Sequence, residues 1–143
     1  MKLAFALLFL AACSSPAPAP SACANDPRVT AFTPGLTGTG PAGAAFTILS
    51  ATPSDVQQGL NDWNVRIRDA SGTPVVGTLT ITSIMPDHGH GSPTDATITA
   101  NGDGTYGISG INLSMRGVWQ ITLTIASPQM NDSSAFDFCV DGT

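Results

Sequence analysis

The chain has few of the residues on which many enzymes and nucleic-acid-binding proteins depend. All ten acidic residues are aspartates, and the one lysine, Lys2, lies at the N-terminus. There are two histidines and no apolar run of the ~20 residues that a membrane-spanning helix needs. Without an N-terminal leader, ten aspartates face four arginines, a net charge of −6. This balance argues against nucleic-acid binding, which requires a basic surface.

The N-terminus has the pattern of an export signal. Lys2 precedes an apolar run over residues 3–12. The run ends in the small residues Ala11 and Ala12, directly before Cys13. A basic start, a brief hydrophobic stretch and small residues at the end are typical of a secretory signal peptide. We therefore predict a signal peptide over residues 1–12 that is removed before Cys13. The alternative is an ordinary signal peptide cut nearby, with Cys13 incidental.

The segment around Cys13 points to a membrane anchor. Leu10-Ala11-Ala12-Cys13 resembles the bacterial lipobox, which implies that the Cys13 thiol is diacylated. Ser14, in place of aspartate, favours the outer membrane, facing the periplasm, over the inner membrane. Residues 13–22 are rich in alternating Pro and Ala, which form an extended spacer. We expect a lipid-anchored protein of the bacterial cell envelope, with the membrane as a partner.

Two further cysteines enclose the predicted domain, residues 23–143. Cys23 and Cys139 lie near its two ends, and neither has a second cysteine or a histidine nearby in sequence. In an oxidising compartment such a pair is expected to form a disulfide. The alternative is two free thiols that add soft metal ligands.

The domain has the pattern of short strands. In residues 63–69, Trp63, Val65 and Ile67 alternate with polar residues, as in a half-buried strand, and we expect Trp63 and Trp119 to be core aromatics. Strands are predicted over residues 44–50, 63–69, 75–85, 95–100, 105–111, 117–126 and 134–140. A short edge strand at 28–32 and a turn of helix within 51–60 are also expected. About seven strands and almost no helix pattern predict an all-β, immunoglobulin-like antiparallel β-sandwich, without the Cys…Trp…Cys spacing of true immunoglobulin domains.

Both histidines fall in one glycine-rich stretch, Met-Pro-Asp-His-Gly-His-Gly at residues 85–91. In extended backbone, His88 and His90 project to the same side with Cα atoms ~6.5–7 Å apart. Gly89 and Gly91 let the backbone bend to bring the rings together. Imidazole suits zinc, copper or nickel, and a thioether adds preference for Cu(I).

Two methionines complete a candidate copper site. Met85 ends one predicted strand and Met115 precedes another. If those strand ends are neighbours, Met85, Met115, His88 and His90 form a copper-type ligand set. Asp87 and Asp95 offer oxygen ligands for Cu(II), or support the histidines by hydrogen bonding. The alternatives are an exposed histidine loop without metal and methionines that belong to the core.

The chain also resembles a known family. The resemblance rests on four stretches that follow one another in the chain: residues 65–75, 85–91, 102–106 and 115–119. The last of these has the sequence Met-Arg-Gly-Val-Trp. Over about residues 63–125 the chain is similar to the YtkA-like, FixH-related family of exported β-sandwich domains. The resemblance implies metal binding or copper delivery through Met85, His88, His90 and Met115, with a copper-handling protein as partner. Many members carry Met in place of His88 or His90, so Cu(I), Cu(II) and zinc all stay open.

Two functional classes follow. The first is a lipid-anchored, copper-binding envelope protein, and the rival is a structural or interaction β-sandwich whose loop binds another protein and no metal. Catalysis is not predicted. The sequence has no nucleophile elbow, and no nearby residue orients Ser92 and a histidine as a nucleophile and base.

Overall fold

The computed structural model describes residue 23 and residues 25–141, which form strands and no helix. The predicted signal peptide (1–12) and linker (13–22), with Cys13, lie outside these residues. A helix with the length and apolar character needed to cross a membrane does not occur in the described part of the chain. The strands are β1 (Leu36–Thr39), β2 (Ala45–Thr52), β3 (Gly59–Arg68), β4 (Thr78–Met85), β5 (His90–Gly91), β6 (Thr97–Ala100), β7 (Thr105–Leu113), β8 (Gly117–Ala126) and β9 (Asn131–Val140).

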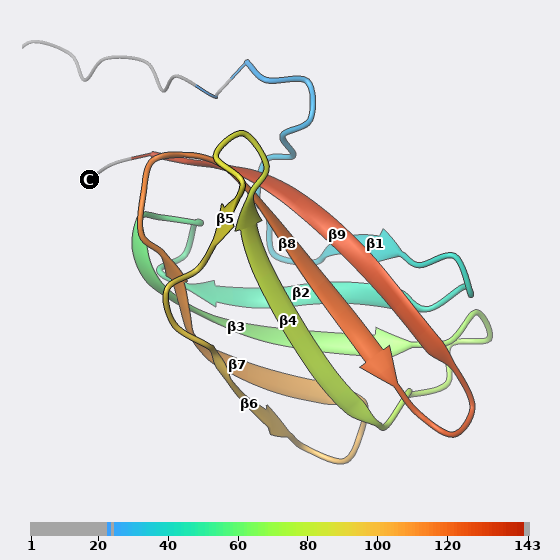
Figure 1. Cartoon of the computed structure of the whole chain (residues 1–143). Coiled ribbons are helices and arrows are strands. Elements are labelled where there is room, and N and C mark those ends of the chain that lie inside the picture. The colour runs from blue at the N-terminus through green and yellow to red at the C-terminus, as the bar shows by residue number, and fades with distance from the viewer. Residues whose placement is uncertain (1–22, 24, 142–143) are drawn as a thin grey trace, which may run out of the picture.

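The strands form two packed antiparallel sheets (Figure 1). One sheet has the order β1-β2-β3-β7-β6 and the other β5-β4-β8-β9. Without the short edge strands β1 and β5, the sheets have the order ABED and CFG of an immunoglobulin constant-type domain. The predicted immunoglobulin-like β-sandwich is therefore confirmed, with two edge strands beyond the expected seven.

The core lies between the two sheets and follows the predicted alternation. On β8, the inward residues Trp119, Ile121 and Leu123 are fully buried. On the facing sheet, Trp63 packs edge-on against Phe138 of β9, with ring centroids 5.7 Å apart. Burying a side chain of this size stabilises the fold by about 1.5–3 kcal/mol. Trp63 and Trp119 are core aromatics, as expected.

Two local predictions are wrong. Residues 28–32 do not form a strand; the first strand is β1, and the earlier segment meets β9 through one backbone hydrogen bond from Thr30 N to Asp137 O (2.8 Å). Residues 51–60 contain no helical turn, because β2 continues to Thr52 and β3 begins at Gly59. The buried side chain of Asn61 makes hydrogen bonds to the backbone of this connection. In a helix, backbone groups would bind one another instead.

The predicted disulfide between Cys23 and Cys139 is present, with a sequence separation of 116 residues. It joins the start of the described chain to β9, one of the two edge strands of the four-stranded sheet. Cys139 lies opposite Val118 of β8. The disulfide therefore fixes the N-terminal segment at the end of the sandwich where β8 begins.

Candidate metal centre

The two histidines lie in a tight turn between β4 and β5, residues 85–90, which we call the His turn. β4 ends at Met85, directly before Pro86, and His90 pairs back with Met85. The Met85 carbonyl accepts hydrogen bonds from the amides of His88 (3.1 Å) and Gly89 (2.9 Å). Gly89 has φ +68°, a left-handed conformation that glycine adopts without steric cost. The glycine between the histidines thus allows the reversal that brings them together.

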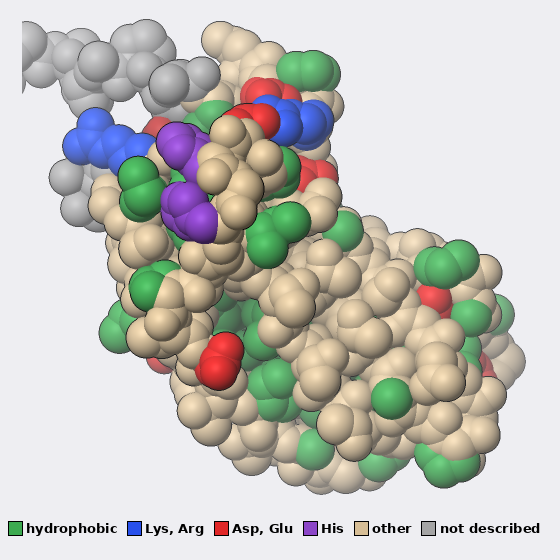
Figure 2. Space-filling model, in the orientation of Figure 1, with side chains coloured by type: hydrophobic (Ala, Val, Ile, Leu, Met, Phe, Trp, Pro, Cys, Tyr) green, Lys and Arg blue, Asp and Glu red, His purple; other side chains and the backbone are tan. Residues whose placement is uncertain are grey.

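His88 and His90 lie side by side on the surface. Their ring centroids are 5.8 Å apart with an interplanar angle of 59°, and both side chains are exposed. Figure 2 shows the pair, in purple, at one end of the molecule. Zinc and copper bind imidazole nitrogen at about 2 Å, so a modest rotation of the rings suffices for both to bind one ion.

His90 also contacts the core below the turn. Its ring lies edge-on to Trp119, with centroids 6.4 Å apart. Its Nδ1 lies 3.3 Å from the carbonyl of Gly91. A proton on Nδ1 is satisfied by that carbonyl, which leaves the lone pair of Nε2 for a metal.

Met85 is the first residue of the His turn and Met115 lies in a neighbouring turn, and the two side chains have different environments. Met85 is fully buried, and a Cβ added to Gly117 would lie 2.8 Å from its Cε, so the glycine gives the methyl group its space. Met115 is 43% exposed in the turn between β7 and β8. Its carbonyl accepts a hydrogen bond from Trp119 Nε1 (2.9 Å). The antiparallel pairing of β4 with β8 brings the end of β4 to the start of β8, as the candidate site requires.

The aspartates near the histidines do not join them. Both carboxylate oxygens of Asp87 accept hydrogen bonds from Arg28, at 2.8 Å each, and Asp95 lies in the connection from β5 to β6. The bound Arg28 guanidinium lowers the pKa of Asp87 and holds the pKa of Asp26 at about 2. Among the described residues, the two imidazoles form no group with a third His, Cys or Asp side chain in which all ligand atoms lie within 4.8 Å of one another. Methionine sulfur is therefore the side-chain donor left to accompany the two rings.

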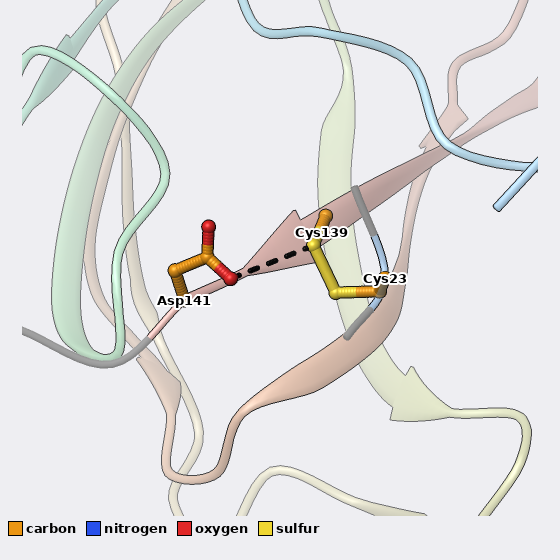
Figure 3. Close-up of side chains that lie close together, drawn as sticks. All are labelled: Cys23, Cys139 and Asp141. Carbon is orange, nitrogen blue, oxygen red and sulfur yellow. Dashed lines mark hydrogen bonds between the residues drawn. A yellow bond between two sulfur atoms is a disulfide. The ribbon is translucent and has the colours of Figure 1, made fainter. Parts of the chain in front are cut away.

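One other group has metal-ligating residue types, namely Cys23, Cys139 and Asp141, whose ligand atoms lie within 4.8 Å of one another. Figure 3 shows the disulfide and the Asp141 carboxylate, whose Oδ1 lies 3.7 Å from Cys139 Sγ. Cysteine binds metals as a thiolate, and both sulfurs are engaged in the disulfide. The alternative of two free thiols as soft ligands does not apply to this oxidised form.

Sequence reasoning missed Arg28 entirely. It lies 59 residues before Asp87, and no periodicity or spacing relates the two positions. The contact of Trp119 with the site did have a signal, since the indole lies four residues after Met115 in the Met-Arg-Gly-Val-Trp motif. That indole was predicted as a core aromatic, and it also holds the backbone of the Met115 turn.

Comparison with known proteins gives a family and a distant structural likeness. The family model described as YtkA-like matches residues 43–124. A solved structure titled "Crystal structure of the Lin-41 filamin domain" is 16% identical and covers 61% of this chain and 81% of its own, with a TM-score of 0.43. No curated protein matches the chain. Because the family match spans more than half of the chain and includes Met85, His88, His90 and Met115, the chain belongs to the YtkA-like family.

Proposed function

We propose that this protein is a lipid-anchored metal-binding protein of the cell envelope that binds or delivers copper through the His turn. The observation that carries the proposal is the pair of exposed imidazoles, 5.8 Å apart. The ring of His90 contacts Trp119, whose indole Nε1 donates to the carbonyl of Met115. Imidazole together with thioether, without a carboxylate, is a soft donor set that favours Cu(I) over harder ions.

The four ligand candidates have different roles in this proposal. His88 and His90 are exposed and bind first, and Met115 adds its sulfur from the neighbouring turn. Met85 is buried under the turn, where its thioether forms the inner side of the site. An ion held on an exposed turn is accessible to a second protein, which suits delivery to a copper-handling partner. We assign the protein no catalytic step.

The features outside the site support an envelope location. The lipobox-like segment that ends at Cys13 is typical of a lipid anchor, and the Pro/Ala spacer is typical of a tether. Ser14 favours the outer membrane. The disulfide between Cys23 and Cys139 is of the kind that persists in oxidising compartments outside the cytosol. Together these features support the proposal that the domain is held near a membrane surface in the periplasm.

Copper-dependent thermal unfolding tests the proposal. We use the chain from residue 13 onward with Cys13→Ser, which removes a thiol that would itself bind copper, and measure Cu(I), Cu(II) and zinc separately. A ligand at 100 times its dissociation constant adds about 2.7 kcal/mol to the free energy of unfolding, which raises the melting temperature by several degrees. We expect this shift with Cu(I), and its loss in His88→Ala/His90→Ala.

Methionine variants separate the thioether from general effects. Met115→Leu is expected to reduce the Cu(I) shift by about half or more. The matched control is Met130→Leu, since Met130 lies in the turn that follows β8, at the opposite end of that strand from Met115. A Cu(I) shift that persists in the double histidine variant refutes the site. The absence of a shift with any metal favours the rival, a structural or interaction domain of the envelope.

A further inference from the structure

We infer that Arg28 determines which metals the His turn prefers, by holding the carboxylate of Asp87 away from the two imidazoles. Arg28 is thus a positioning residue rather than a ligand. The inference rests on the proposed function and names the feature that selects among metals at that site.

The segment that carries Arg28 is fixed on both sides of this residue. Five residues before it, Cys23 is bonded to Cys139 of β9. Two residues after it, Thr30 N donates to Asp137 O of the same strand (2.8 Å), and Phe32 then packs edge-on against Phe138 with centroids 6.2 Å apart. The guanidinium is therefore presented to the His turn from a segment held on β9.

The arginine engages two aspartates with good geometry. Nη1 and Nη2 each donate to one oxygen of Asp87, at 2.8 Å, and Nε and Nη2 donate to the two oxygens of Asp26, at 2.9 and 2.7 Å. Exposed ion pairs are weak one at a time, but a paired two-bond geometry within a network is the favourable case. Asp26 holds the guanidinium in the orientation that binds Asp87.

Asp87 is the carboxylate best placed to alter the site. It directly precedes His88, its side chain is 53% exposed, and both of its oxygens are bound by Arg28. Carboxylate oxygen suits Zn²⁺ and Cu(II), whereas Cu(I) prefers sulfur and imidazole. While Arg28 binds Asp87, the donors at the turn are imidazole and thioether; without Arg28, Asp87 is free to rotate and bind an ion beside His88.

The experiment compares four proteins, all of which carry Cys13→Ser. They are the otherwise unchanged chain, Arg28→Ala, Asp87→Asn and Arg28→Ala/Asp87→Asn. Zinc and Cu(I) affinities are measured by competition with chelators. We expect Arg28→Ala to raise zinc affinity by about tenfold, the scale at which residues around metal ligands change affinity. The double variant and Asp87→Asn should bind zinc like the unchanged chain, and all four should keep their Cu(I) affinity.

Two controls exclude simpler explanations. Arg68→Ala removes the same charge from a partly exposed arginine at the far end of β3 and should leave zinc affinity unchanged. In metal-free protein, hydrogen exchange at the amides of His88 and Gly89 should quicken equally in Arg28→Ala and in the double variant. Both variants then loosen the turn to the same degree and differ only in whether residue 87 is a carboxylate. A gain of zinc affinity confined to Arg28→Ala is therefore caused by the Asp87 carboxylate.

Each outcome decides the inference. If zinc affinity rises in both Arg28→Ala and the double variant, the effect comes from a loosened turn and the inference is overturned. The inference is also overturned if Arg28→Ala does not raise zinc affinity while Cu(I) still binds. If none of the four proteins binds Cu(I) or zinc, the proposed function fails together with the inference. If Cu(I) still binds to every variant, a failure of the inference leaves the proposed function standing.

Discussion

At the scale of single residues, Asp132 shows how one buried carboxylate fixes two segments of the chain. Its oxygens accept hydrogen bonds from the amides of Ala42 (3.1 Å), Ala44 (2.8 Å) and Ser133 (2.9 Å). Burial by itself raises the pKa of Asp132, but the three amide donors outweigh it and leave the pKa below its usual value. Asp132 thus stabilises the fold in its ionised form.

The pH dependence of this contribution follows from the direction of the shift. Because the folded pKa lies below the unfolded value of about 3.9, the stabilisation is complete above that value and is lost as the pH falls through the folded pKa. We expect Asp132→Asn to lower the free energy of unfolding by about 1–3 kcal/mol at neutral pH. Urea denaturation should show a smaller difference in acid. Asp95→Asn, on an exposed aspartate, is the control, and an equal loss at both pH values would contradict the assignment.

At the scale of elements, the connection between β2 and β3 depends on Asn61. This fully buried side chain accepts a hydrogen bond from Gln57 N (3.0 Å) and donates to the carbonyls of Gln57 (2.8 Å) and Gly59 (3.1 Å). In the irregular segment 53–58, both backbone polar groups of Gln57 are therefore satisfied by a side chain of the strand that follows. A side chain that replaces backbone hydrogen bonds in this way is costly to remove.

Asn61→Ala is expected to lower the free energy of unfolding by about 2–3 kcal/mol, since it leaves backbone groups of the connection without partners. The matched control is Asn64→Ala on the same strand. Asn64 is exposed and makes one side-chain hydrogen bond, to Ser50 Oγ (3.1 Å), so its loss should change stability by at most ~0.5 kcal/mol. Chemical denaturation measures both, and equal effects of the two substitutions would rule out this role for Asn61.

At the scale of the whole molecule, the disulfide closes nearly the entire domain. Cys23 and Cys139 are 116 residues apart, and a loop of that length stabilises by about 4–5 kcal/mol in the chain-entropy model. It also holds the segment that presents Arg28 to the His turn. The disulfide is therefore expected to matter for stability and for the order of the candidate site.

Replacing both cysteines, Cys23→Ser/Cys139→Ser, is expected to lower the melting temperature by roughly 10 °C or more, with the sandwich retained below it. The physical reason is the larger conformational freedom of the unfolded chain. Calorimetry measures the effect, and Cys13→Ser is the control that should leave it unchanged. An unaltered melting temperature would show that packing of the N-terminal segment on β9, such as Phe32 against Phe138, already suffices.

The sequence by itself determined the strands and their inward faces. Alternation of apolar and polar side chains is a local property with a period of two, so β3 and β8 could be predicted with Trp63 and Trp119 facing the core. The Cys23–Cys139 disulfide and the family also followed from residues visible in the chain. Local pattern failed where a segment has no period, as at residues 28–32 and 51–60.

Only the tertiary structure decided how the candidate site is built. The pairing of β4 with β8 brings the end of one strand to the start of another, which buries Met85 and leaves Met115 exposed. The contact of Arg28 with Asp87 spans 59 residues and depends on the disulfide-held segment lying beside the His turn. Periodicity describes neighbours along a strand, whereas these contacts arise from the packing of separate strands and loops at one end of the sandwich.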